Sequence, residues 1–270
     1  MTGSQSSLAT SMQRLSSGLR VNSAKDDAAG LAIAERMNAQ VRGMNVAIRN
    51  ANDAISLGQT AEGALGKVGD IFQRMRELAV QSANGTNSDA DRTSLNEEFT
   101  QLAQEATRTL GGTQFNGQNI LATTNDSTFQ IGANNTTDID RITVAAFDWT
   151  ANTDITGTLG SAVITGTEIP TAQITDVAGA QAALASIDAS INAVNSQRAT
   201  FGAVQNRFEN VVSTLMVAAE NQAASRSRIM DADYASETAN LSRASILQQA
   251  GNAMVAQANQ LPQQVLALLR

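Results

Sequence analysis

The residues best suited to chemistry are two adjacent carboxylates, Asp26 and Asp27, which follow Lys25. Such a pair could hold a metal ion or serve in acid–base catalysis. Neighbouring residues on a helix point in different directions, however, so the two carboxylates do not converge on one atom. The chain also lacks His, the commonest general base, and Cys, the usual thiolate ligand. We therefore expect a solvated turn with a helix-capping Asp, no metal or cofactor, and a protein that is not an enzyme.

Trp149 is the only tryptophan and lies in the middle of the chain. An exposed indole could stack on a sugar ring, whereas a buried one would fill a small hydrophobic core. We favour the core, and sugar binding remains the alternative. Asn125 and Asn135 begin triplets that fit the N-glycosylation pattern, but so short a motif is common.

The composition restricts the class of protein. The chain has 18 Lys and Arg residues and 25 Asp and Glu residues, which gives a net charge of −7. This negative charge argues against a nucleic-acid partner. No apolar run is long enough to predict a transmembrane helix, and residues 1–20 lack the apolar centre of a cleaved signal peptide. Aromatic residues make up only 3%, and the apolar content is mostly Ala, Leu, Ile, Val and Met, as in long helices.

Apolar residues recur at steps of three and four through the first half of the chain, which is typical of a helix with one apolar seam. The register changes partway, so we expect the helix to loosen between Gly58 and Gly63. A turn cluster at 84–89 ends this helix, and Ser88 or Asp89 caps the next, which stops at Gly111-Gly112. The apolar positions are Ala34, Met37, Val41, Met44, Ile48, Ala51 and Ile55, then Ala61, Leu65, Val68, Phe72, Met75 and Leu78, and finally Leu95, Phe99, Leu102, Ala106 and Leu110.

The middle of the chain has a different sequence pattern, without a helical seam. Strand-like stretches at 129–131 and 142–144 flank a polar segment and predict a β-hairpin. The Thr-, Gly- and Ala-rich stretch 150–171 is predicted to be a small β-rich insertion or an ordered loop.

A second long seam begins at Ala180 and places Arg198 at an apolar position. Arg226 lies in the same setting. Because a buried Arg must be paired, we expect Asp or Glu partners from the N-terminal helices or from another copy of the chain. The other seam residues are Leu184, Ile187, Ile191, Val194, Phe201, Gln205, Phe208, Val212, Leu215 and Ala219.

After a break near 229–231, a further helix is predicted from Tyr234 to Leu261, and Pro262 begins a final turn. Its apolar residues continue to the chain end and need a partner. They are Leu241, Ile246, Leu247, Met254, Val255, Leu261, Val265, Leu266, Leu268 and Leu269.

Together these patterns predict a mainly α protein. Long antiparallel helices from both chain ends form a bundle or coiled-coil-like rod, with a β-hairpin and a small β-rich insertion between them. Helical ends separated by a short polar middle cannot each bury their seams alone. They must pack on each other or on further copies, which predicts a self-assembling structural protein.

Several segments resemble blocks of bacterial flagellin, in the same order along the chain. The resemblance covers roughly residues 4–122 and 180–270. The blocks are QRLSSGLR at 13–20, VNSAKDDAAG at 21–30, RELAVQSAN at 76–84, TQFNG at 113–117, GAVQNRF at 202–208, DADYASE at 231–237 and LPQQVLALLR at 261–270.

The resemblance implies a subunit of the flagellar filament, exported by the type III route without a cleaved signal, for motility outside the cell. It implies a partial inner-core segment at 1–30, a helical core domain made of 31–122 and 180–230, a hairpin with a short variable insertion at 123–179, and an inner-core helix at 231–270. Flagellins usually carry further residues before the equivalent of Ser4, so the resemblance also implies a shortened N-terminus.

Partners follow from the same resemblance: further copies of the chain, an export chaperone, and cap and hook proteins. The alternative function is a flagellin homologue that acts as a cell-surface adhesin or binds polysaccharide. The residues implied for the assembly seam are Val41, Met44, Ile48, Leu184, Ile191, Phe208 and Leu215. Those implied for the inner core and the chaperone are Leu241, Leu247, Val255, Leu266 and Leu269.

Receptor recognition is a further implication. Residues 13–34 are similar to the flagellin segment sensed by plant surface receptors, with Asp26 and Gly30 at sensitive positions. Arg74, Leu78 and Glu98 match positions that a vertebrate Toll-like receptor recognises. This face would pack against neighbouring subunits, so we expect recognition of the monomer and not of the filament.

Overall fold

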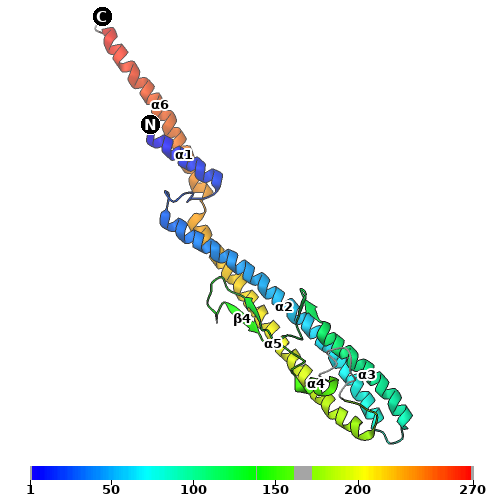
Figure 1. Ribbon diagram of the computed structural model, residues 1–270. Helices are drawn as coiled ribbons and strands as arrows, with labels where there is room; N and C mark the ends of the chain where they lie inside the picture. The colour runs from blue at the N-terminus through cyan, green and yellow to red at the C-terminus, as the bar shows by residue number, and fades with distance from the viewer. Residues whose placement is uncertain (1, 138, 161–171, 269–270) are drawn as a thin grey trace. The chain divides into compact units, whose positions relative to one another are not determined.

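The computed structural model describes residues 2–137, 139–160 and 172–268, with the side chains of 2, 4 and 259–268 outside the description. It is mainly helical, as predicted (Figure 1). The elements in chain order are α1 (Thr2–Ser17), α2 (Ala28–Ser82), α3 (Asp89–Gly112), β1 (Gln114–Phe115), β2 (Gln118–Asn119), β3 (Ser127–Gln130), β4 (Arg141–Val144), α4 (Thr153–Leu159), α5 (Val177–Met230) and α6 (Tyr234–Leu268).

The chain divides into two compact units. Unit 1 comprises Met1–Arg42 with Val217–Arg270, and unit 2 comprises Gly43–Met216. Unit 1 therefore joins the two ends of the chain, as the seams required. The division falls inside α2 and α5, whereas the expected domain limits lay at the loops near residues 30 and 230.

The seam of α2 is continuous through unit 2, so the prediction that the helix loosens between Gly58 and Gly63 is wrong. Every third or fourth residue from Ala51 to Ser82 is buried, without a shift of register. Gly58 serves close packing: an added Cβ would lie 3.1 Å from Cγ of Gln205 on α5. The buried positions are Ala51, Ala54, Gly58, Ala61, Leu65, Val68, Phe72, Met75, Leu78, Ala79 and Ser82.

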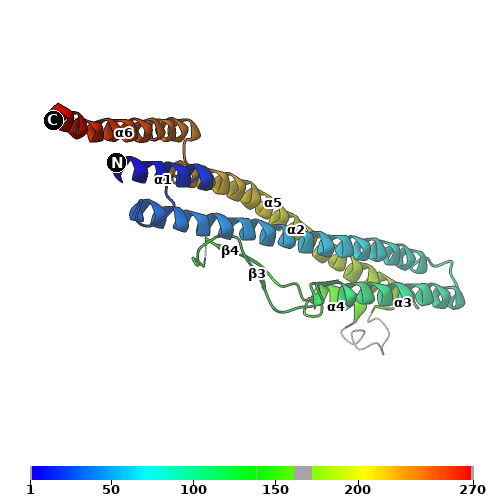
Figure 2. The same cartoon turned by 90° about the horizontal axis from the view of Figure 1, so that it is seen from above.

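Within unit 2, α5 runs antiparallel to α2, and the two lie side by side in both views (Figures 1 and 2). Residue numbers rise on one helix as they fall on the other: Arg76 pairs with Asp188 at 2.7 Å and Glu62 with Arg198 at 3.8 Å. The predicted carboxylate partner of Arg198 is thus confirmed. The predicted burial of Arg198 is wrong, because its side chain is 43% exposed. An ion pair so open to water contributes little to stability.

In unit 1, Arg226 is half-buried, and the expected carboxylate partner does not appear among the residues that the structure describes. The helix α6 continues past Pro262 to Leu268, where a separate final turn was expected.

Helix α3 begins as predicted. The Ser88 hydroxyl accepts from the Asp91 backbone N–H, and the Asp91 carboxylate accepts from the Ser88 backbone N–H, a reciprocal capping box. Phe99 and Leu110 are fully buried against the core. The turn between α2 and α3 reverses the chain, so that the two helices lie alongside each other (Figure 2).

Two antiparallel hairpins follow α3. The pairing of β3 with β4, with Phe129 opposite Ile142, confirms the predicted hairpin. The hairpin of β1 and β2 was not predicted. The sequence signal for this hairpin is the dipeptide Asn116-Gly117, because a two-residue turn needs positive φ at both positions. The structure has φ values of 50° and 77° there.

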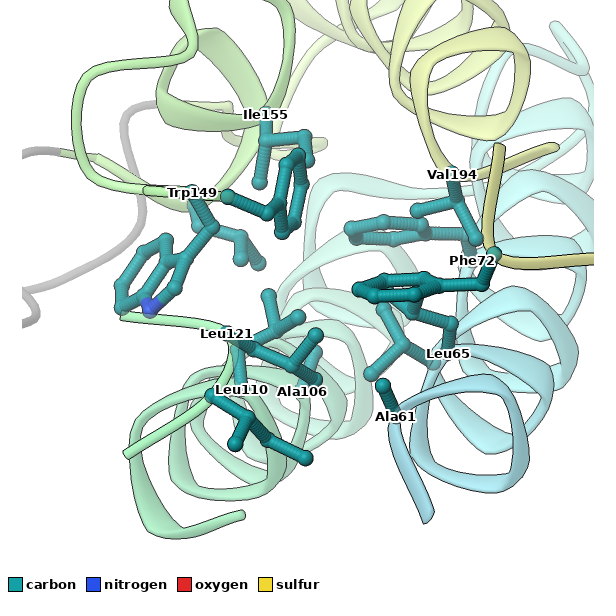
Figure 3. Packing of buried hydrophobic residues seen from close by; sticks show 14 of the residues in the cluster. Ala61, Leu65, Phe72, Ala106, Leu110, Leu121, Trp149, Ile155 and Val194 are labelled. Carbon is teal, nitrogen blue, oxygen red and sulfur yellow. The ribbon is translucent and has the colours of Figure 1, made fainter. Parts of the chain in front are cut away.

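The middle of the chain corrects two expectations. Thr153–Leu159 is helical, capped by the Asn152 side chain, so this part of the insertion is not β-rich; residues 161–171 lie outside the description. Trp149 is 1% exposed and belongs to the core cluster together with Leu121 and Ile155 (Figure 3). Its indole cannot stack on a sugar, so the core interpretation is confirmed.

In unit 1 the connection between α1 and α2 pairs with the connection between α5 and α6. Leu19 forms an antiparallel bridge with Asp231. Arg20 N–H donates to Met230 O at 2.6 Å, and Ala232 N–H donates to Gly18 O at 2.9 Å. Each connection therefore satisfies backbone groups that the helix ends leave unpaired.

The paired connections require glycine at position 18. Gly18 has a φ of +72°, and an added Cβ would lie 3.2 Å from Oη of Tyr234. We expect Gly18→Ala to destabilise unit 1 by about 1–2 kcal/mol, because a left-handed backbone disfavours Cβ. Amide hydrogen exchange at residues 18–20 and 230–232 would measure the loss. Gly3→Ala is the control, since an added Cβ meets nothing within 4 Å there. Equal protection in both variants would contradict the expectation.

Candidate assembly and recognition surfaces

The residues predicted for function are distributed over both units. Among the described residues there is no group of three or more acidic side chains placed to hold a metal ion. Nor does any described helix combine the length and apolarity needed to cross a membrane.

Asp26 organises the turn that leads into α2. Its Oδ2 accepts the backbone N–H groups of Asn22 at 3.2 Å and Ser23 at 2.9 Å, and the Ser23 hydroxyl at 3.0 Å. These bonds, led by the one from the Asn22 backbone, hold the pKa of Asp26 below its ordinary value of 3.8. Asp26, a predicted receptor residue, thus also holds the shape of this loop.

Asp27 caps α2, which confirms the helix-capping interpretation. Its Oδ1 accepts from Gly30 N–H at 2.8 Å. Gly30 is buried, and an added Cβ would lie 2.8 Å from Cγ of Asp27. Any other residue at position 30 would displace the cap, so Gly30 has a structural role whether or not a receptor contacts it.

The Asp26 turn should depend on pH. The folded pKa lies below the unfolded one, so the carboxylate stabilises the turn above pH 3.8, and this contribution is lost as the pH falls through the lower folded pKa. We expect Ser23→Ala to raise the pKa of Asp26 toward 3.8 without reaching it, since the backbone donors remain. Carbon-detected NMR titration of the carboxyl group would measure the change. Ser242→Ala on α6 is the control, and an unchanged Asp26 titration in Ser23→Ala would contradict the account.

On unit 2, the α2–α3 hairpin brings Arg74 and Glu98 together as expected. The Arg74 Nε and Nη2 atoms lie 3.0 and 2.8 Å from Oε1 of Glu98, and Nη1 lies 2.9 Å from Oε2 of Glu77. Hydrogen bonds to Glu77 and then Glu98 raise the pKa of Arg74. The three side chains form one exposed, charged cluster.

Leu78 does not join this exposed cluster. It is 1% exposed and packs in the core of unit 2, so it cannot contact a receptor directly while the unit is folded. Its place in the α2 seam explains the burial. The expectation of an exposed surface made of Arg74, Leu78 and Glu98 is therefore corrected to Arg74 and Glu98, with Glu77 added.

Sequence reasoning missed Arg92, which is 5% exposed. Its guanidinium donates to the Ser82 carbonyl and, through Nη2, to the carbonyls of Asn84 at 3.2 Å and Asn87 at 3.0 Å. It thereby caps the C-terminus of α2, whose last turn carries no basic residue of its own. The available signal was a basic residue in the first turn of α3, where the helix dipole disfavours positive charge.

The residues implied for the assembly seam differ in how far the chain itself buries them. Phe208 is completely buried, edge-on to Phe129 with ring centroids 5.6 Å apart. Its contacts in the monomer are therefore internal. The other seam residues are half-buried, namely Val41, Met44, Ile48, Leu184, Ile191 and Leu215.

Among the described side chains of unit 1, the most exposed apolar ones lie on α6. Ile246 is 65% exposed and Met254 71%, and they lie about two turns apart on the helix, with Leu247 and Val255 beside them. Leu241 is half-buried. The side chain of Leu266 and the whole of Leu269 lie outside the described residues.

Comparison with known proteins places this architecture in a family. Residues 1–126 match the family described as "Bacterial flagellin N-terminal helical region", and 184–269 match "Bacterial flagellin C-terminal helical region". A flagellin of Halalkalibacterium halodurans is 49% identical over 96% of this chain and 90% of its own length, and flagellin D of Vibrio anguillarum is 36% identical over 100% and 95%. The crystal structure of Bacillus cereus flagellin, 36% identical, superposes with a TM-score of 0.51 over 66% of this chain and 94% of its own. The chain therefore belongs to the bacterial flagellin family, whose members are structural subunits of the flagellar filament.

Proposed function

We propose that this chain polymerises into a flagellar filament that serves motility. The observation that carries the proposal is the exposed apolar face of α6, in a unit built from both chain ends. Exposed apolar area of this kind is stabilised when another copy covers it. Many repeated contacts of one kind then produce a helical polymer through heterologous interfaces.

The remaining partners follow from this function. An export chaperone would cover the apolar residues of α6 before assembly, and type III export would deliver the chain. Hook and cap proteins would contact the two ends of the filament. Innate receptors of vertebrates would recognise the Arg74–Glu98 cluster, and those of plants the segment around Asp26 and Gly30. The two exposed charges and the tightly bonded loop support these assignments.

Ile246→Asp tests the assembly. A carboxylate buried between copies loses its hydration, so we expect the fraction that sediments as filament to fall at least tenfold, equivalent to about 1.4 kcal/mol. Asn252→Asp is the control, because it adds the same charge at an exposed polar position of α6. Trp149 fluorescence should report an unchanged unit 2 in both variants.

Electron microscopy of the pelleted material identifies the polymer. Failure of the unsubstituted chain to form filaments, even with filament seeds, would overturn the proposed function. Normal assembly of Ile246→Asp would remove the α6 face from the interface.

A further inference from the structure

Unit 2 contains a groove that is lined neither by α6 nor by the residues named above for the assembly seam. It has a volume of about 670 Å³ and lies between the β1–β2 hairpin, the following segment 120–126, strand β3 and Leu57 of α2. Its size is within the range of small-molecule sites, roughly 300–1,000 Å³.

The floor of the groove is apolar and firmly held. Leu57, Phe115 and Phe129 are half-buried and pack against the core with one side, which leaves the other side to line the groove. Phe129 is held by its edge-on contact with Phe208 and by its pairing with Ile142. The aromatic surface is therefore in place before any ligand arrives.

Four carboxamides belong to the polar rim of the groove. Asn116, Gln118, Asn119 and Asn125 are exposed, and their side chains make no hydrogen bond to the rest of the described chain. Each carboxamide offers two donor hydrogens and an acceptor oxygen. Among the described residues of the lining, Asp126 is the only charged one, and its Oδ1 accepts from Ala146 N–H at 2.8 Å.

We propose that this groove binds a neutral oligosaccharide. A sugar ring has an apolar C–H face, which suits the Phe and Leu floor, and hydroxyl groups that both donate and accept, which suit the carboxamide rim. The described residues that line the groove include no cationic side chain, so an anionic ligand would meet the Asp126 charge without compensation. The site is distinct from Trp149, which is buried in the core.

The test uses the full-length monomer with maltotetraose, cellotetraose and N-acetylated chitotetraose, all neutral, as probes. We expect at least one of them to shift the NMR signals of residues 115–129 and to give a measurable heat of binding. The double variant Asn119→Ala/Asn125→Ala should then bind about tenfold more weakly or worse, which equals about 1.4 kcal/mol. The control is Gln101→Ala, which removes an exposed carboxamide from α3.

Three outcomes would overturn the proposal. One is the absence of shifts with all three sugars at millimolar concentration, and another is unchanged affinity in the double variant. The third is a double variant that no longer sediments as filament while no sugar binds, which would make the groove a contact for a second copy of this chain. Loss of sugar binding with normal sedimentation would support the proposal and leave the assembly function intact.

Discussion

We expect Arg92→Met to lower the free energy of unfolding of unit 2 by about 2–4 kcal/mol, since hydrogen bonds from a charged donor are strong and a buried acceptor without a partner is costly. The guanidinium donates hydrogen bonds to the carbonyls of Ser82, Asn84 and Asn87. Met fills the volume of the Arg side chain without donating a hydrogen bond. Ser82 is fully buried, so water cannot easily replace the lost donor there. The turn that places α3 against α2 should loosen first.

Trp149 is the only tryptophan and is buried in unit 2, so its fluorescence during urea unfolding reports this unit. Arg76→Met is the matched control, because Arg76 is an exposed Arg paired with a single exposed carboxylate, Asp188. The control should unfold at nearly the same urea concentration as the parent chain. Arg92→Lys should fall between the two, since one ammonium cannot reach all three carbonyls. Equal midpoints for Arg92→Met and Arg76→Met would contradict the capping role.

Features that depend on neighbours in sequence were predictable. The steps of three and four located α2, α3 and α5, because a helix repeats its face at that spacing. The turn at 84–89 and the cap at Ser88 followed from short polar residues before an apolar run. The β3–β4 hairpin followed from two β-prone stretches around a polar segment. In each case a single local signal was strong and nothing elsewhere in the chain opposed it.

Features that depend on distant residues were not predictable from spacing. Arg92 is useful only because the last carbonyls of α2 lie within its reach, and the pairing of Arg20 with Met230 joins segments from opposite chain ends. The sequence pattern predicts a weak point at Gly58, yet Gln205 approaches α2 closely there. A glycine within a helix can mark a weak point or a close contact with another helix. Only the position of the partner helix distinguishes the two.

Leu78 illustrates how two predictions can compete. Its spacing made it a seam residue of α2, while the resemblance to flagellin made it a receptor contact. The packing requirement prevails in the folded monomer, where Leu78 is 1% exposed. Arg74 lies one helical turn before it, outside the seam, and remains exposed.

Leu78→Ala should lower the free energy of unfolding of unit 2 by about 2–5 kcal/mol, because it removes buried methyl groups and leaves a cavity in the core. Trp149 fluorescence in urea measures this loss. Arg74→Ala removes only exposed hydrogen bonds to Glu77 and Glu98, so its unfolding midpoint should stay close to that of the parent chain.

The two variants also separate direct from indirect effects on receptor recognition. If Arg74 and Glu98 form the contact, Arg74→Ala reduces activation of a Toll-like receptor reporter cell although the monomer stays folded. Leu78→Ala then reduces activation only as far as unit 2 loses its structure, and Leu78→Met, which nearly keeps the volume, restores both stability and activation. A folded Leu78→Met protein without receptor activity would show instead that the leucine side chain itself is recognised, which requires α2 to expose it on binding.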